Sequence, residues 1–279
     1  VTKSSAIEGE FLNQEQVRSS IARKLGLDVA GMVSSSRNID GIVEMMLDAT
    51  QNFQQPLTRE RLFAWQAALF PTARSGMTPI TVGNWRTSKS GPMQVVSGAI
   101  GRERVHFEAP AAERIPQEME RFLLWLEQDQ GIDSVMKAGI AHFWFVTIHP
   151  FEDGNGRVGR AIADLLLARS DGMAERFYSL SSQIESERKE YYEKLEACQR
   201  GGLDITLWLR WFLECFGRAL MEAETLLEQV LRKARLWQRI NQDPINDRQR
   251  VVLNRLLDGF EGKLTSSKYS KLAKCSADT

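Results

Sequence analysis

The chain has 279 residues, of which 43% are hydrophobic and 26% are charged, as in ordinary soluble globular proteins. Basic and acidic residues both number 36, so the net charge of zero favours neither nucleic acid nor an anionic membrane as a general partner. The three cysteines form no disulfide or metal pattern, and no apolar run is long enough to cross a bilayer. With no signal peptide in view, we expect a cytoplasmic protein that does not enter a membrane. Because the chain starts at Val1 rather than at methionine, part of the natural N-terminus is expected to precede it.

The first seventy residues show helical periodicity broken by capping and helix-stopping residues. A helix is predicted at the start, where Ser5 and Glu8 have the spacing of a capping box and Ile7 and Phe11 pack behind them. Apolar residues at helical spacing predict three further helices, over residues 14–25, 39–52 and 57–69.

Residues 72–109 are rich in glycine and proline and carry the one predicted hairpin of an otherwise helical chain. Short strand-like runs over 93–97 and 104–108 flank a Gly-Ala-Ile-Gly turn. This hairpin is either a stabilising flap over the core or the lining of a binding site, and the residues alone leave both open. The pair Trp85-Arg86 before it receives no chemical role.

The second half is predicted to be helical. Helices are expected over 113–130, 133–148, from Val158 onward, over 184–195 as a single helix, and over 205–231 with an aromatic stripe in the core. His142, inside one of them, is expected to be a hydrogen-bonded core residue. Two shorter helices over 247–258 and 265–273 follow a linker at 241–244. With their lysines they resemble the first half of a winged helix-turn-helix, so this part either contacts DNA or is a small packing subdomain.

The stretch from His149 to Arg160, between two of these helices, concentrates residues that suit phosphates. Gly154 and Gly156 permit backbone conformations that aim successive N–H groups at one anion, at the positive end of a helix. Arg157 and Arg160 lie three residues apart, so they share a helix face and can bind neighbouring phosphates.

The same stretch also supplies a metal ligand and a base. Asp153 offers the hard carboxylate oxygens that Mg²⁺ prefers, and a phosphate-bound Mg²⁺ would lie beside it. His149 can accept a proton from an attacking hydroxyl near neutral pH. A base, a metal ligand and phosphate-binding groups in one loop favour the transfer of a phosphate-containing group from a nucleotide.

These twelve residues match the Fic motif, H-P-F-x-[D/E]-G-N-G-R-x-x-R, without departure, and the chain resembles the Fic-domain protein adenylyltransferase family. The resemblance implies an all-α, Fic-type helical bundle with one β-hairpin flap. It implies transfer of AMP from ATP to a Ser, Thr or Tyr hydroxyl of a target protein, with His149 as base and Asp153 as Mg²⁺ ligand. It places the target along the 93–108 hairpin by strand addition. The ATP-binding residues that it implies are Gly154, Asn155, Gly156, Arg157, Gly159 and Arg160, with Tyr191 against the adenine and Phe151 anchoring the loop.

The start of the chain resembles a second feature of the family. Ser4-Ser5-Ala6-Ile7-Glu8-Gly9 matches the pattern [S/T]-x-x-x-E-[G/N] of many Fic proteins. The resemblance implies that Ser4, Glu8 and Gly9 form an inhibitory segment and that Glu8 pairs with Arg160. The resulting division has an N-terminal segment with the inhibitory helix (1–35), a Fic catalytic domain (36–240) and a partial winged-helix-like module (241–279).

Two other functions stay open at this point. The same site could remove AMP from a protein or transfer another phosphate-containing group, although Arg157 and Arg160 favour a triphosphate donor. Alternatively, the chain could be a non-enzymatic regulator that senses nucleotide and contacts DNA through 241–279. The complete pair of His149 and Asp153 argues against this regulator, because binding alone needs no base. The sequence leaves the target and the oligomeric state open, with a homodimer as one option.

Overall fold

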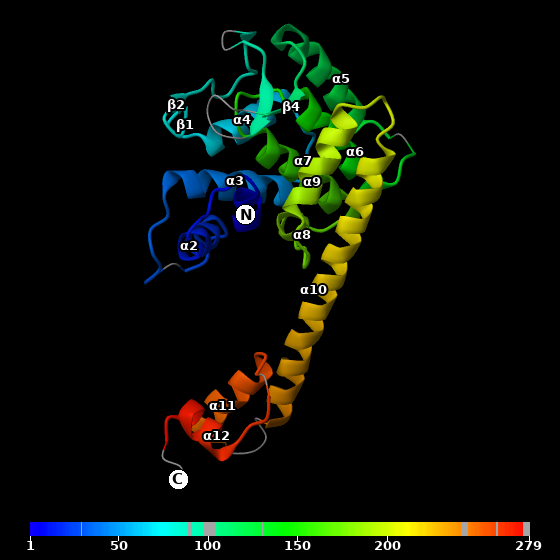
Figure 1. Cartoon of the computed structure of the whole chain (residues 1–279). Coiled ribbons are helices and arrows are strands. Elements are labelled where there is room, and N and C mark those ends of the chain that lie inside the picture. Colours follow the sequence, from blue (N-terminus) through cyan, green and yellow to red (C-terminus); the bar gives the residue numbers. More distant parts are fainter. Residues whose placement is uncertain are drawn as a thin grey trace. The chain divides into compact units, whose positions relative to one another are not determined.

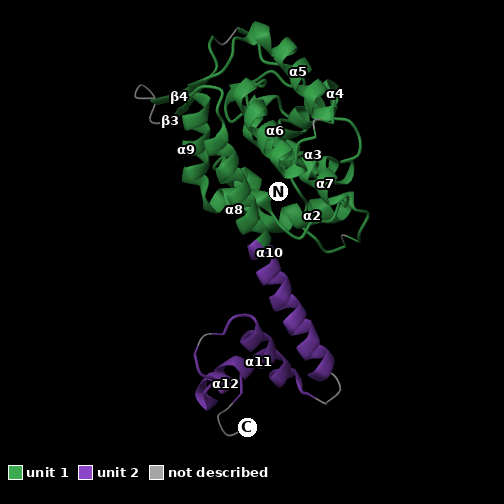
Figure 2. Ribbon diagram, turned by 90° about the vertical axis from the view of Figure 1, so that its right-hand side faces the viewer, with its two compact units in different colours: residues 1–220 green, residues 221–279 purple. Residues whose placement is uncertain are grey.

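The computed structural model describes residues 1–28, 30–88, 91–97, 104–129, 131–240, 245–260 and 262–275. They form two compact units, Val1–Leu220 and Met221–Thr279, which Figure 2 distinguishes by colour. The described residues are mostly helical and include two small antiparallel hairpins. The predicted all-α architecture with a β-hairpin flap is confirmed.

Four helices open the first unit and match the predicted periodicity closely. Side chains of Asn13, Ser36 and Thr58 cap the second, third and fourth of them by accepting backbone N–H bonds. The four helices are α1 (Thr2–Ile7), α2 (Gln14–Lys24), α3 (Arg37–Gln51) and α4 (Arg59–Leu69).

The predicted capping box at the start of the chain is wrong. The N-cap of α1 is Val1, and among the described residues no side chain caps that helix. Ser5 is fully buried inside α1, and Glu8 lies at the C-terminal end of the helix rather than in its first turn. Phe11, predicted to pack behind the box, is 85% exposed. Glu8 is therefore free for a contact other than capping, and that contact lies in the motif described below.

Two hairpins follow, where the sequence predicted one. The predicted hairpin pairs β3 (Gln94–Ser97) with β4 (Arg104–Glu108), and its turn lies outside the described residues. The missed one pairs β1 (Arg74–Ser75) with β2 (Thr78–Pro79). Strands of two residues are too short for an alternating apolar pattern, so periodicity could not reveal them.

The long helix α7 (Asn155–Asp171) lies at the centre of the first unit (Figure 1). It packs against α6 (Ser134–Ile148), α3, α4 and α1, and nearly all of its side chains from 155 to 168 are buried. The short 3₁₀ turn η2 (Ala112–Arg114) and helix α5 (Ile115–Glu127) precede α6, and α5 packs on both η2 and α6. A helix that is buried on all sides must pack against another element on each face. This packing fixes the position of α7 and therefore of the loop that leads into it.

The predicted single helix over 184–195 is in fact two, α8 (Leu180–Ser186) and α9 (Arg188–Gln199). They are separated at Glu187, whose backbone leaves the helical region (φ −107°, ψ 25°). Arg218 of α10 (Thr206–Ile240) donates two hydrogen bonds of 2.6 Å to the Glu187 carboxylate, and so holds the break in place. The aromatic stripe of α10 is in the core as predicted, with Trp208, Trp211 and Phe212 buried.

The second unit contains the part of α10 from Met221 together with α11 (Asp247–Leu257) and α12 (Ser266–Ala273). Asn246 and Gln249 form a capping box on α11, and both helices fall where they were predicted. The linker at 241–244 and the end at 276–279 lie outside the described residues. The three-part division of the chain and the DNA contact stay predictions. Within the described ranges no helix is long and apolar enough to cross a membrane.

Candidate active site

One buried arginine binds the backbone of the loop from His149 to Gly154. Arg86, 4% exposed, donates from Nε to the His149 carbonyl (2.7 Å) and from Nη2 to the Pro110 carbonyl (2.5 Å). Its backbone N–H donates to the Pro150 carbonyl at 2.9 Å. Sequence analysis assigned Arg86 no role, because one arginine after a tryptophan carries no signal of a partner 63 residues away.

Asn155 and Phe151 close the loop on itself. The Asn155 side chain accepts from the Phe151 N–H (3.0 Å) and donates to the Phe151 carbonyl (2.8 Å). Both side chains are buried, and Phe151 packs between Trp85 and Phe145. The Asn155 amide therefore fixes the backbone of the loop, and its predicted role in binding ATP stays a prediction.

The backbone conformation of the loop and one hydrogen bond set the orientation and the protonation of the His149 ring. His149 ends α6 in the left-handed region (φ 52°), and Gly154 (φ 88°) begins α7 from the same region. The His149 Nδ1 atom lies 3.2 Å from the Val146 carbonyl, which can only accept a hydrogen bond. Nδ1 consequently carries the proton, and Nε2 keeps a free lone pair. Burial lowers the pKa of His149 to about 4, so the ring is neutral near pH 7 and can act as a base.

The two acidic residues of the loop are both held by the missed hairpin and the segment after it. The Ser75 hydroxyl donates to one oxygen of Asp153, and the Gly154 N–H donates to the other at 2.5 Å. Thr81 donates from its backbone N–H and from its hydroxyl to Glu152, each at 2.9 Å. Two hydrogen bonds thus orient the Asp153 carboxylate, while Glu152 attaches the loop to Thr81.

Asp153 stands as a single carboxylate, and the described residues contain no group of three or more metal-ligating side chains. Such a site suits Mg²⁺, which keeps several waters and uses one or two carboxylates together with substrate phosphates. The residues present therefore fit a cation that arrives with a nucleotide.

The outer arginine of the motif is paired with the start of the chain. Arg160 is 1% exposed, and its Nη2 lies 2.8 Å from a carboxylate oxygen of Glu8. Its Nε and Nη2 also donate to the hydroxyl and the carbonyl of Ser4, both at 2.9 Å. Burial raises the pKa of Glu8, but the charge and hydrogen bond of Arg160 outweigh it and leave that pKa below its usual value. Within the described residues, Arg160 Nη1 is buried and has no hydrogen-bond partner.

The inner arginine has a carboxylate partner that the sequence did not reveal. Arg157 Nη1 lies 2.9 Å from Glu10, and its guanidinium stacks over the Phe70 ring at 5.1 Å. Asn38 of α3 donates to the other oxygen of Glu10 at 2.6 Å. Gly9 (φ 84°) turns the chain between the two glutamates, so one short segment places a carboxylate on each arginine.

Two of the predicted glycines have different physical roles. A Cβ on Gly156 would lie 2.2 Å from the Glu8 carboxylate, so this glycine keeps open the space above the helix start. A Cβ on Gly159 would meet Val146 at 2.9 Å. Gly159 therefore allows α7 to approach α6 closely, and its predicted role in binding ATP stays a prediction.

The tyrosine predicted to contact adenine lies in the core. Tyr191 is 1% exposed, packs on Trp208 and Trp211, and hydrogen-bonds His142 (2.9 Å). Its ring has no exposed face for a base, which counts against the predicted stacking. Tyr192, 37% exposed, lies with its hydroxyl 3.3 Å from the Glu8 carboxylate. The predicted core role of His142 agrees with its full burial.

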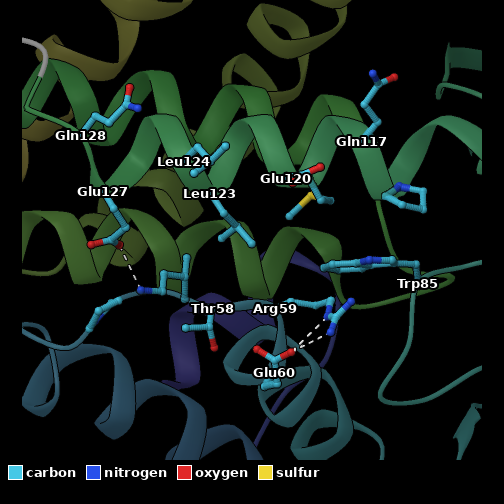
Figure 3. Close-up of a pocket in the computed structure, with 14 residues that line it drawn as sticks. Thr58, Arg59, Glu60, Trp85, Gln117, Glu120, Leu123, Leu124, Glu127 and Gln128 are labelled. Atoms are coloured by element: carbon cyan, nitrogen blue, oxygen red, sulfur yellow. Dashed lines mark hydrogen bonds and ion pairs between the residues drawn. The ribbon is translucent and has the colours of Figure 1, made fainter.

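A groove of about 1010 Å³ lies between the start of α4 and one face of α5 (Figure 3). Its lining includes Leu57, Trp85, Leu123 and Glu120, and none of its lining residues belongs to the loop. Figure 3 places Trp85 at one end of this groove, and the Trp85 ring packs on Phe151 with centroids 5.2 Å apart. The groove is thus a neighbour of the active-site loop rather than the active site.

Comparison with known proteins agrees with the fold and the loop. Residues 56–167 match the Fic/DOC family, and residues 1–27 match a domain of unknown function (DUF4172). Two solved structures share the fold. A Fic family protein from Desulfovibrio desulfuricans is 23% identical, with a TM-score of 0.60, over 98% of this chain and 73% of that one. A Fic domain containing signalling protein from Bacteroides thetaiotaomicron is 22% identical, with a TM-score of 0.55, over 79% and 82% of the two chains. Residues 56–167, which include the loop, therefore resemble a Fic/DOC domain, and the fold of the chain is that of solved Fic proteins.

Three curated relatives are named as established or probable protein adenylyltransferases. Protein adenylyltransferase fic-1 of Caenorhabditis elegans is 30% identical over 124 residues, which are 44% of this chain and 22% of that protein. Protein adenylyltransferase Fic of Drosophila mojavensis is 35% identical over 104 residues, 37% and 19% of the two chains. Probable protein adenylyltransferase aq_aa38 of Aquifex aeolicus is 31% identical over 99 residues, 36% and 28% of the two chains. The matches span less than a third of the length of each of these relatives.

Proposed function

We propose that the protein transfers AMP from ATP to a Ser, Thr or Tyr hydroxyl of a target protein. The observation that carries the proposal is a neutral His149 whose free Nε2 lies in a loop leading into a helix with two arginines near its start. A base next to an anion-binding helix N-terminus suits an attack by a hydroxyl on a bound phosphate.

In the proposed step His149 Nε2 takes the proton of the target hydroxyl. The hydroxyl oxygen attacks the α-phosphorus of ATP, the bond from that phosphorus to the bridging oxygen breaks, and pyrophosphate leaves. Arg157, Arg160 and the N–H groups at the start of α7 hold the phosphates. A Mg²⁺ ion bound at Asp153 would neutralise phosphate charge there.

The target is proposed to add as a strand to the β3–β4 hairpin. In the described part of the chain this hairpin is a two-stranded sheet, so its outer edges carry backbone groups that can pair with an extended segment. Main-chain pairing would align a target hydroxyl with the loop without requiring one particular target sequence.

The contact of Glu8 with Arg160 is proposed to hold the enzyme in a poorly active state. Arg160 is almost fully buried and needs an anionic partner, and a triphosphate would supply one in place of Glu8. While Glu8 occupies this place, the γ-phosphate loses its partner and the α-phosphate lies out of line with the incoming hydroxyl. Misplacement by about 1 Å can cost on the order of 10²-fold in rate.

Incubation with α-labelled ATP, Mg²⁺ and a cell lysate tests the proposal. Label should appear on protein, more strongly with Glu8→Gly and not with Glu8→Gly/His149→Ala. Label from a γ-labelled donor alone would indicate phosphate transfer. Release of AMP from a pre-modified protein, without any labelling, would indicate the reverse reaction.

A further inference from the structure

The small hairpin of β1 and β2 reaches across to the acidic residues of the active-site loop. Ser75, the last residue of β1, donates from its hydroxyl to Asp153, 78 residues further along the chain. The Ile80 N–H donates to the Ala73 carbonyl at 3.1 Å and closes the base of the hairpin. Thr81, next in the chain, is bonded twice to Glu152. The hairpin is therefore fixed to the loop at a point other than Asp153.

This arrangement determines how Asp153 can present itself. One carboxylate oxygen accepts from the Gly154 N–H, which belongs to the same loop and moves with it. The other oxygen accepts from Ser75, which belongs to a separate element. The Ser75 hydroxyl is thus the contact that fixes the rotation of the Asp153 carboxylate against the rest of the fold. Each carboxylate oxygen can accept a second interaction, so a cation can bind while both hydrogen bonds remain.

We propose that Ser75 is a positioning residue that sets the orientation of Asp153 for a divalent cation bound together with ATP. The inference rests on the proposed function, because it assumes that Asp153 binds the cation of a nucleotide. Groups that hydrogen-bond a metal-ligating carboxylate fix its orientation, and their loss typically lowers metal affinity or activity by about 10- to 100-fold. Ser75 touches neither phosphate nor target in this role and acts only through Asp153.

The test measures how much Mn²⁺ strengthens the binding of ATP, by isothermal titration with and without the metal. All variants carry Glu8→Gly so that the triphosphate can reach Arg160. Asp153→Ala should abolish the strengthening. Ser75→Ala should reduce it about tenfold, leave metal-free ATP binding unchanged and keep the melting temperature of the parent, while Ser75→Thr should restore it.

Thr81→Val is the matched control, because it removes a hydroxyl bond from the same segment but to Glu152. It should leave the Mn²⁺ effect unchanged. An equal Mn²⁺ effect in Ser75→Ala and its parent would overturn the proposal, and so would an equal loss in Thr81→Val, since that loss would point to the placement of the hairpin rather than to the Ser75 hydroxyl. If the parent shows no Mn²⁺ effect, the metal role of Asp153 and this inference fall together, while protein labelling still decides AMP transfer separately.

Discussion

The two halves of the Fic motif are held in different ways. The loop before α7 is held from within the bundle, where Arg86 binds the backbone carbonyl of His149 and Asn155 binds the backbone of Phe151. The two arginines after it are held by carboxylates of the first ten residues. Contacts of the first kind engage backbone atoms and leave the His149 Nε2 lone pair unused, so they are compatible with a bound nucleotide. Contacts of the second kind occupy the groups that a triphosphate would need.

Burial explains why the arginines need those carboxylates. A buried guanidinium without an anion is costly, and pairing it with a carboxylate removes that cost as a phosphate would. Arg160 is more deeply buried than Arg157, and its side chain is 1% exposed against 9%. We therefore expect the Glu8 contact to dominate and the Glu10 contact to be the weaker of the two. The following experiments separate the permanent contacts from the competing ones.

The largest effect is expected at the base. His149→Ala in a Glu8→Gly background should lower target labelling by about 10²- to 10⁴-fold, because the variant loses the proposed general base. ATP binding should change little, since the arginines and the helix start hold the phosphates. Rate measurements and isothermal titration check the two statements, and near-normal labelling by this variant would remove His149 from its role.

The next effect comes from the competing contact at Arg160. Glu8→Gly should raise automodification and target labelling on the order of 10²-fold, because the γ-phosphate then finds its partner and the α-phosphate comes into line. Glu8→Asp should raise both less. Arg160→Ala should stay inactive even without Glu8, because the arginine also binds phosphate. Equal labelling by wild type and Glu8→Gly at saturating ATP, with both folded, would show that the contact is structural only.

Asp153 belongs to the same loop but is proposed to bind the cation of the nucleotide, so the effect of its loss should depend on the metal concentration. Asp153→Ala should lower the labelling rate by about 10- to 100-fold, and higher Mg²⁺ should restore part of it. The rate is measured across a Mg²⁺ titration, with circular dichroism confirming the fold. A defect that ignores the metal concentration would assign Asp153 to loop structure, alongside Glu152.

A smaller effect is expected for the second carboxylate. Glu10→Ala should raise ATP affinity by about two- to fivefold, because a partly exposed ion pair contributes on the order of 1 kcal/mol or less and Glu10 is about a third exposed. Asn38→Ala should act in the same direction and more weakly, since it only orients Glu10. Titration of ATP measures both. Glu15→Ala, on the exposed first turn of α2, is the control and should change nothing.

Sequence reasoning was strongest where the signal was local. Helical spacing predicted the helices on both sides of the loop, and twelve consecutive residues identified the motif, because each depends on neighbours in the chain. Contacts between common residue types that lie far apart in the sequence could not be predicted. Arg86, Ser75 and Thr81 lie 63, 78 and 71 residues from their partners in the loop, and Glu10 lies 147 residues from Arg157.

The burial of Tyr191 and the helix break were both beyond what the local sequence could predict. Adjacent residues on a helix point about 100° apart, so Tyr191 and Tyr192 can differ in burial, and the apolar pattern around them is too weak to predict which of the two is buried. The helix break at Glu187 is held by Arg218, 31 residues away, and no neighbouring residue in the sequence predicts it.

The smallest expected change concerns pH and tests whether the held loop really keeps its base neutral. Burial lowers the pKa of His149 to about 4, against an ordinary value near 6.5. The base works as the neutral ring, so kcat/KM of the Glu8→Gly protein should stay nearly constant from pH 8 down to about 5 and fall only as the pH approaches 4. The lowered pKa of His149 should also make the folded protein less stable at acidic pH. The unfolded chain takes up this proton below pH 6.5 and the folded one does not, so the free energy of unfolding should decline between pH 6.5 and 4. A pH–rate profile with circular dichroism at each point separates the two, and a half-maximal rate near pH 6.5 in folded protein would mean that the His149 ring is exposed to water in the working enzyme.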